Sequence, residues 1–148
     1  LVGSEMCIRD SNILAMEKNI RIFAIDDDEV ILDIYESGFG AKGYDIKTFI
    51  DPKKAKEYLL EGKDLPDIIL MDIMMPSIDG ISLMREIRSN PKTSHIPIIS
   101  VSGLSDAATL NDALLFGAAD YVVKPFDLDT LELKIKKALE MPKKKRAE

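Results

Sequence analysis

Short apolar runs alternate along this chain with longer segments in which apolar residues recur every three or four positions. The most apolar run is Ile68–Met71, and a carboxylate, Asp72, follows it directly. Four consecutive apolar residues are typical of a strand that is covered on both faces, as in a parallel sheet. Further strands are expected over residues 20–25, 45–49, 96–101 and 121–123. The pattern therefore predicts five strands, of which Ile68–Met71 is the most deeply buried.

A helical pattern follows each predicted strand, and capping residues mark where the helices begin and end. Asp28, Asp51 (before Pro52), Ser105 and Asp127 are expected to cap helix starts, and Gly43, Gly62 and Gly117 to follow helix ends. The residues expected on the inner faces of the five helices are, in order, Val30, Ile31, Ile34, Tyr35 and Phe39; Ala55, Tyr58 and Leu59; Ile81, Leu83, Met84 and Ile87; Leu110, Ala113, Leu114 and Phe116; and Leu128, Leu131, Ile135 and Leu139. Five strand–helix alternations predict an α/β fold, a doubly wound five-stranded parallel sheet with helices on both faces.

Length and composition limit the class of protein. The 148 residues fit one domain, and a net charge of −6 argues against nucleic acid as a partner. The single cysteine, Cys7, excludes an internal disulfide and favours a reducing compartment. No apolar run is long enough to span a membrane, and no signal-peptide layout is present. We therefore expect a cytoplasmic protein that does not enter a membrane.

The two ends of the chain differ from the rest. Residues 1–15 show neither periodicity, and residues 6–11 resemble translated sequencing adaptor, so we expect the natural protein to begin at Met16. An ordinary N-terminal extension is the alternative. We expect the domain to cover residues 16–141 and a basic tail to cover 142–148. If the chain is complete, this is a single-domain protein, although a truncated gene would look the same.

Polar side chains are expected to meet at the carboxyl ends of the strands, the edge of an open α/β sheet where ligands bind. Asp26, Asp27 and Asp72 would converge there, together with Ser102 and Lys124. Carboxylates that lie close together need a cation, or else their pKa values rise. Oxygen ligands without His or Cys suit Mg²⁺, which also binds phosphate, and lysine can hold a phosphate oxygen. One of the carboxylates could accept a phosphoryl group.

Four motifs, in this order and at strand ends, resemble those of the response-regulator receiver domains of two-component signalling, particularly the stand-alone chemotaxis type. They are Ile25–Asp28, Leu70–Pro76, Val101–Gly103 and Tyr121–Phe126. The resemblance covers roughly residues 20–139. It implies the flavodoxin-like receiver fold with strand order 2-1-3-4-5.

The resemblance also implies roles for the acidic residues. Asp72 would be the phosphoacceptor, and Asp26, Asp27 and Asp72 would bind Mg²⁺ together with the backbone carbonyl of Met74. The protein would not be an enzyme beyond accepting a phosphoryl group from a donor and slowly losing it. A departure from the commonest family pattern is Ser102, which stands where threonine is more frequent.

Three further roles and the partners are implied in the same way. Ser102 would be the switch hydroxyl, Lys124 would pair with the phosphoryl group, and Tyr121 would be an aromatic switch that turns inward. The predicted fourth helix, fifth strand and fifth helix would then present an altered surface. A sensor histidine kinase or a histidine phosphotransfer protein would supply the phosphoryl group to this phosphorelay. The downstream target would be an unknown protein, and phosphorylation could produce a homodimer.

Two alternatives compete with this interpretation. Asp26 and Asp28 also resemble the nucleophile and general acid of Mg²⁺-dependent haloacid-dehalogenase-type phosphatases, a reading that leaves Asp72 without a role. The other alternative is a receiver-like binding module that is never phosphorylated.

Overall fold

A five-stranded parallel sheet forms the centre of the molecule. The computed structural model describes residues 19–73, 80–103, 111, 113–115 and 117–140. The strands are β1 (Arg21–Ile25), β2 (Asp45–Phe49), β3 (Ile68–Met71), β4 (Ile98–Ser102) and β5 (Asp120–Val123). They lie in the order β2-β1-β3-β4-β5, with every neighbouring pair parallel, which confirms the predicted fold and strand order.

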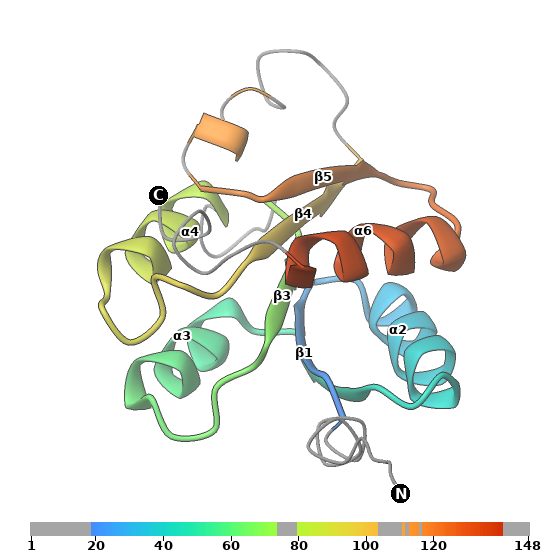
Figure 1. Cartoon of the computed structure of the whole chain (residues 1–148), viewed down its shortest axis with the longest axis horizontal. Helices are drawn as coiled ribbons and strands as arrows, with labels where there is room; N and C mark the ends of the chain where they lie inside the picture. Colours follow the sequence, from blue (N-terminus) through green and yellow to red (C-terminus); the bar gives the residue numbers. More distant parts are fainter. Residues whose placement is uncertain (1–18, 74–79, 104–110, 112, 116, 141–148) are drawn as a thin grey trace, which may run out of the picture.

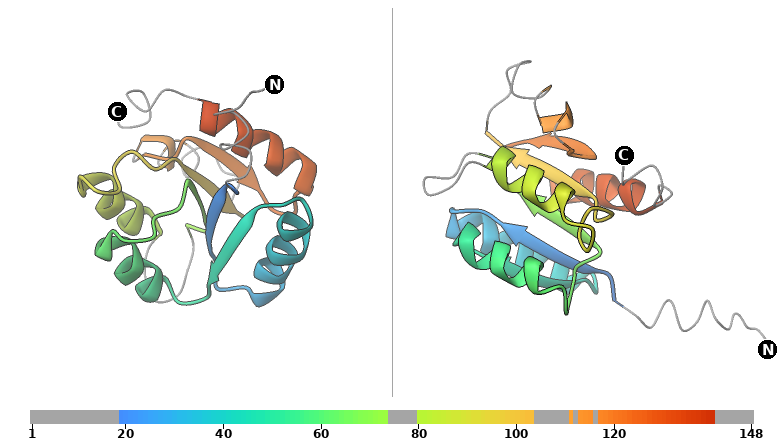
Figure 2. Two further views of the ribbon diagram at one scale, coloured as in Figure 1. Left: turned by 60° about the horizontal axis from the view of Figure 1, so that its bottom comes forward. Right: turned by 90° about the vertical axis from the view of Figure 1, so that its left-hand side faces the viewer.

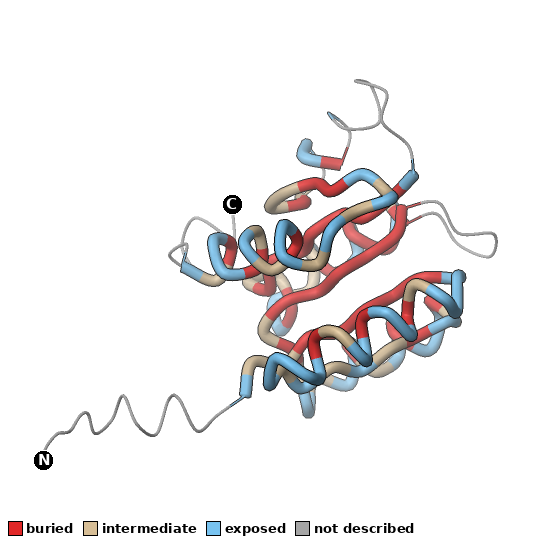
Figure 3. The backbone as a smooth tube through the Cα atoms, turned by 90° about the vertical axis from the view of Figure 1, so that its right-hand side faces the viewer, coloured by how far each residue is buried: buried red, intermediate tan, exposed pale blue. Residues whose placement is uncertain are grey.

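Helices cover both faces of this sheet. They are α2 (Glu29–Ala41), α3 (Pro52–Glu61), α4 (Gly80–Ser89) and α6 (Leu128–Glu140), and residues 111 and 113–115 are also helical. Figures 1 and 2 show α2 and α6 on one side of the sheet and α3 and α4 on the other. Because side chains alternate between the faces of a strand, the strands supply two separate apolar clusters, one under each pair of helices. The tube in Figure 3 is accordingly buried along the central strands, while the helices alternate between buried and exposed positions.

The predicted capping residues lie where helices begin and end. The Asp28 and Asp51 carboxylates accept hydrogen bonds from the backbone N–H groups of Val30 and Lys53, each at 2.9 Å. At the start of α6 the Asp127 carboxylate accepts one from the Asp129 backbone N–H. Gly62 ends α3 in the left-handed conformation, with φ of 73°. These local signals located the starts of α2, α3 and α6 and the end of α3.

The predicted inner face of the first helix is partly wrong. Val30 is 65% and Ile34 40% exposed, whereas Leu32 is buried with Tyr35 and Phe39. The apolar residues of this helix cover a wide arc opposite the polar side that carries Asp33 and Glu36, so periodicity alone did not identify the part of the arc that packs on the sheet. Leu114, expected to face inward, is 48% exposed. Ala113, the residue before it, is buried in the core instead.

Three strands also differ from the expectation in their boundaries. The first begins at Arg21 rather than at Ile20. The fourth strand runs from Ile98 to Ser102 rather than from Ile96 to Val101. Pro97 lacks an N–H, although its carbonyl still accepts a hydrogen bond from Ile69. The fifth strand begins one residue early, at Asp120.

Several predictions lie outside the described residues: those for residues 1–15, Met74, Ser105, Leu110, Phe116 and 142–148.

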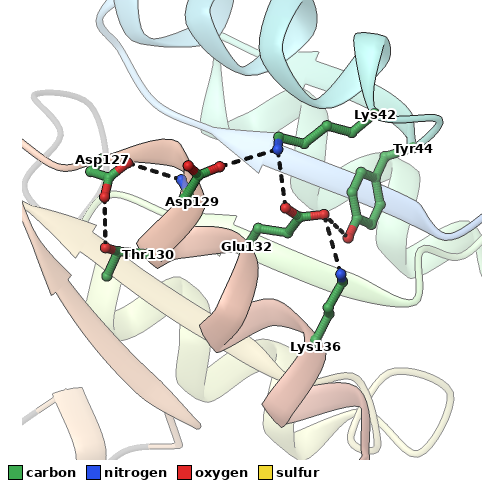
Figure 4. A network of polar contacts seen from close by, with 7 residues as sticks. All are labelled: Lys42, Tyr44, Asp127, Asp129, Thr130, Glu132 and Lys136. Atoms are coloured by element: carbon green, nitrogen blue, oxygen red, sulfur yellow. Dashed lines mark hydrogen bonds and ion pairs between the residues drawn. The ribbon is translucent and has the colours of Figure 1, made fainter.

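A polar network joins the end of α2 and the start of β2 to α6 (Figure 4). The Glu132 carboxylate accepts a hydrogen bond from the Tyr44 hydroxyl at 2.9 Å, and it pairs with Lys42 at 3.2 Å and with Lys136 at 3.6 Å. Lys42 also pairs with Asp129 at 3.2 Å. The network therefore links segments that are far apart in the sequence: Lys42 and Asp129 are separated by 87 residues, and Tyr44 and Glu132 by 88.

Within the part of the chain that the structure describes, no helix combines the length and apolar character needed to cross a membrane.

Candidate functional site

The carboxyl ends of β1 and β3 hold two aspartates side by side. The Asp26 backbone N–H donates to the Phe49 carbonyl at 3.1 Å, and the Asp72 backbone N–H donates to the Ile25 carbonyl at 3.0 Å. The ladder of the sheet thus continues as far as the two acidic residues. Both are nearly inaccessible, with exposed fractions of 1% for Asp26 and 6% for Asp72. The apolar strands before them position these carboxylates at a buried sheet edge.

Asp27 completes an acidic cluster at this edge. One carboxylate oxygen from each of Asp26, Asp27 and Asp72 lies within 4.8 Å of the others, with Asp27 exposed and the other two buried. An Mg²⁺ ion binds oxygen ligands at roughly 2.0–2.1 Å in an octahedron, in which two ligands are at most about 4.2 Å apart. Small side-chain adjustments would therefore let these oxygens share one ion. The prediction that the three aspartates converge is borne out by this geometry, and the three residues fit Mg²⁺.

Lys124 connects β5 to the same cluster. Its Nζ lies 2.7 Å from Asp26 Oδ2 and 3.2 Å from Asp72 Oδ2. Its backbone N–H donates to the Ser102 carbonyl at 2.8 Å, so the strand pairing of β4 and β5 extends to the residue that carries the amine. The described site therefore contains three carboxylates and one ammonium group.

Burial and charge act in opposite directions on the titration of this pair. Burial raises the pKa of the Asp26 carboxyl above its ordinary value, and it outweighs the hydrogen bonds from Lys124 and from the Asp28 backbone N–H. Burial lowers the pKa of the Lys124 amine, but its contacts with Asp26 and Asp72 together outweigh burial and raise that pKa. The site is thus a place where added positive charge stabilises the carboxylates.

Two other predicted residues lie next to this centre. Ser102 is 1% exposed at the last position of β4, and Tyr121 is 9% exposed in β5, where it belongs to the apolar cluster under α3 and α4. The Tyr121 side chain is thus already buried in this arrangement. The structure brings Ser102 to the site through its backbone contact with Lys124, while the predicted Met74 carbonyl lies outside the described residues.

The family of the chain follows from comparison with known proteins. A family model described as the response regulator receiver domain matches residues 22–136. The chain belongs to this family. The match runs from within β1 to within α6, so the resemblance drawn from the four motifs is confirmed at the level of the family.

Similar proteins include receivers with very different overall lengths. The receiver is 36% identical over 107 residues to the response regulator PleD from Caulobacter vibrioides, covering 72% of this chain and 23% of PleD. It is 37% identical over 124 residues to the probable transcriptional regulator ycf27 from Guillardia theta, covering 84% of this chain and 47% of that protein. The chain therefore spans less than half the length of these two curated relatives. A crystal structure of a putative response regulator from Chloroflexus aurantiacus superposes with a TM-score of 0.78 at 27% identity, covering 84% of this chain and 100% of that one.

Two residues with close tertiary contacts, Gly80 next to Asp72 and Arg88 at the end of α4, were not singled out from the sequence. Gly80 begins α4 against the backbone after β3: a Cβ at this position would lie 2.4 Å from Ile73 Cα and 2.7 Å from the Asp72 carbonyl oxygen. The Arg88 guanidinium in the last turn of α4 donates to the Gly117 carbonyl at 2.7 Å and 3.0 Å, and to the Ser94 carbonyl at 3.1 Å. The signal for Gly80 was its place at the start of a helical pattern. Nothing in the local pattern around Arg88 indicated its partners.

Proposed function

We propose that this receiver accepts a phosphoryl group on Asp72 and holds Mg²⁺ while doing so. The observation that carries the proposal is the convergence of Asp26, Asp27 and Asp72 within 4.8 Å, with the Lys124 ammonium on two of them. The chain is a receiver domain of the kind used in two-component signalling, and such domains typically bind Mg²⁺.

The acceptor role falls to Asp72 because of where its carboxylate lies. It sits at the end of the central strand β3, adjacent to β1 on one side and to β4 on the other. A carboxylate oxygen of Asp72 attacks the phosphorus atom of the donor, and a new O–P bond forms. The bond between phosphorus and the leaving group breaks, and the donor departs with the bonding electrons. The product is an aspartyl phosphate, and the donor has lost one phosphoryl group.

The other side chains of the site would bind the metal or contact the phosphoryl oxygens. Asp26, Asp27 and Asp72 would bind the metal with the backbone carbonyl of Met74, which completes the set implied by the family. When bound, Mg²⁺ supplies positive charge that offsets the carboxylates and the incoming phosphoryl oxygens. Lys124 Nζ already lies 3.2 Å from Asp72 Oδ2, so its ammonium is placed to pair with a phosphoryl oxygen once the acceptor is modified. The Ser102 hydroxyl would donate to another such oxygen.

Phosphorylation would then act as a charge switch. The new negative charge would draw Lys124 and Ser102 toward Asp72, and Tyr121 and the segment that follows β4 would take up a second arrangement. The surface formed by residues 105–117, β5 and α6 would present this change to a downstream protein or to a second copy. A sensor histidine kinase or histidine phosphotransfer protein would be the donor. The second arrangement is populated to some degree without phosphate, because the modification shifts an existing equilibrium.

The phosphatase alternative is disfavoured by the position of Asp28. Its carboxylate is bound to the backbone N–H of Val30 as the cap of α2, and the residue is exposed. A general acid would instead have to point at the leaving group of a substrate bound to Asp26. Asp26 itself is engaged by Lys124 and by the Asp28 backbone N–H.

Intact mass measured after incubation with Mg²⁺ and acetyl phosphate tests the proposal. We expect the parent to gain one phosphoryl group and Asp72→Asn to gain none. Asp51→Asn, which alters a helix cap outside the cluster, is the matched control and should be phosphorylated like the parent. A gain that persists in Asp72→Asn and disappears in Asp26→Asn would support the phosphatase chemistry, and no gain in the parent would support a binding module.

A further inference from the structure

Ser100 interrupts an apolar row that crosses the entire sheet. The strand register places Phe49, Ile25, Met71, Ser100 and Tyr121 side by side, one from each strand in spatial order. Residues paired in this way have their side chains on the same face. The other four belong to the apolar cluster beneath α3 and α4. Ser100 is the polar member of this row.

The Ser100 hydroxyl is buried and lacks a hydrogen-bond partner in the part of the chain that the structure describes. Ser100 is 0% exposed, and its Oγ is the buried side-chain polar atom without a hydrogen-bond partner among the described residues. Thr93 offers a direct comparison, since it is also 0% exposed and its hydroxyl donates to the Ile87 carbonyl at 2.6 Å. A buried hydroxyl with no partner costs free energy, and removing it can stabilise a protein. Ser100 therefore makes the arrangement seen here less stable than the same arrangement with an apolar residue.

The Ser100 hydroxyl lies beside Ser102 and Tyr121, the two residues proposed to move on phosphorylation. Ser100 is two residues from Ser102 on the same face of β4, and it is paired directly with Tyr121 in β5. The same cluster contains the small residues Ala113 and Ala118, which precede β5 in the chain. A movement of Ser102 or Tyr121 therefore changes the immediate surroundings of the Ser100 hydroxyl before it affects the more distant core.

We propose that Ser100 is a regulatory residue of this receiver, whose hydroxyl is unpaired in the arrangement described here and gains a hydrogen bond in the phosphorylated arrangement. This inference rests on the proposed function of Asp72. The unpaired hydroxyl destabilises one arrangement and the new hydrogen bond stabilises the other, so both effects favour switching. A ligand that selects the second arrangement must then bind more weakly when the hydroxyl is absent, because the equilibrium between the two arrangements has shifted.

The test compares two hydroxyl deletions in the full chain. Ser100→Ala removes the unpaired hydroxyl, and Thr93→Val removes a paired one of similar burial at a site away from the acidic cluster. Beryllofluoride with Mg²⁺ serves as the probe, because it mimics a phosphoryl group on a carboxylate. Its apparent affinity and the urea midpoint of the free protein are measured for the parent and both variants. Asp72→Asn is included to show that binding of the probe depends on the proposed acceptor.

For Ser100→Ala we expect a higher urea midpoint than for the parent and a weaker affinity for beryllofluoride by about fivefold, which corresponds to about 1 kcal/mol. For Thr93→Val we expect a lower midpoint and an unchanged affinity. An affinity of Ser100→Ala equal to or tighter than that of the parent would overturn the inference, and so would a lower midpoint. If the parent itself failed to bind the probe, or Asp72→Asn bound it equally well, the proposed function would fail first, independently of Ser100.

Discussion

Lys124 Nζ lies 2.7 Å from Asp26 Oδ2, although the two residues are 98 positions apart in the chain. The contact joins the ends of β1 and β5, which lie on either side of β3 and β4 in the sheet. It places the single described ammonium of the site between two buried carboxylates, Asp26 and Asp72. Lys124 thus provides, in the absence of metal, part of the positive charge that the cluster requires.

Replacing Lys124 with methionine should make the stability of the receiver depend strongly on Mg²⁺. The variant leaves three carboxylates together without a cation, so we expect a loss of about 2 kcal/mol in the free energy of unfolding without metal. Added Mg²⁺ should restore much of this loss, and it should raise the urea midpoint more in Lys124→Met than in the parent.

Lys134→Met is the matched control for this experiment. Lys134 pairs with Asp120 at 3.0 Å, where both side chains are about one third exposed, at 33% and 34%. Its removal should change stability by less than about 1 kcal/mol and leave the response to Mg²⁺ like that of the parent. Equal responses to Mg²⁺ in the parent and in Lys124→Met would contradict the charge-balancing role of Lys124.

Gly80→Ala should damage both the fold and the acceptor. Its Cβ would meet the backbone of Asp72 and Ile73 at distances of 2.4–2.7 Å, and backbone cannot move aside as a flexible side chain can. We expect a loss of about 2–3 kcal/mol in the free energy of unfolding and slower phosphorylation by acetyl phosphate. Urea denaturation and the time course of intact mass measure the two effects.

Gly40→Ala is the corresponding control in α2. A Cβ at Gly40 would have no neighbour within 4 Å, and the residue lies inside the helix. Alanine should therefore stabilise the protein by about 0.5–1 kcal/mol and leave phosphorylation unchanged. If both glycine variants lost stability equally, the close approach at Gly80 would not be the cause.

Glu132→Gln should change the dependence of stability on pH. The hydrogen bond from the Tyr44 hydroxyl, with further contributions from Lys42 and Lys136, holds the pKa of the Glu132 carboxyl below its ordinary value of 4.5 against the opposing effect of burial. A carboxyl whose pKa is lower in the folded state stabilises the fold above its unfolded pKa, and this contribution is lost as pH falls through the folded value. We expect the parent to exceed Glu132→Gln by about 0.5–1 kcal/mol at neutral pH.

The difference between these two proteins should disappear as the pH is lowered below 4.5, the ordinary pKa of glutamate. Urea midpoints across this range provide the measurement. Glu57→Gln, at an exposed position of α3, serves as the control and should differ from the parent by less than about 0.5 kcal/mol at neutral pH. A difference for Glu132→Gln that stayed constant from neutral to acidic pH would show that charge on Glu132 does not stabilise the junction of α2 and α6.

Much of the fold and the polar centre could be predicted from local patterns. Apolar runs ending in a charged residue identified β1 and β3, and parallel pairing then required Asp26 and Asp72 to meet at one edge. Capping signals such as Asp51–Pro52 located helix starts because a few adjacent residues determine them.

The remaining features depend on tertiary packing. The exposed positions of Val30 and Ile34 follow from the rotation of α2 about its axis, which the wide apolar arc of this helix does not determine by itself. The contact of Arg88 with the Gly117 carbonyl joins residues 29 positions apart, and no local periodicity encodes it. The unpaired hydroxyl of Ser100 became visible only when its neighbours across the sheet were known.

Chemical identification of the modified residue tests the central claim most directly. The parent is phosphorylated with acetyl phosphate and Mg²⁺ and then treated with borohydride, which reduces an acyl phosphate to an alcohol and so converts a phosphorylated aspartate to homoserine. Peptide mass spectrometry then locates the changed residue. We predict homoserine at position 72 and unchanged aspartate at positions 26 and 27. Homoserine at position 26, or at none of the three, would contradict the assignment of Asp72 as the phosphoacceptor.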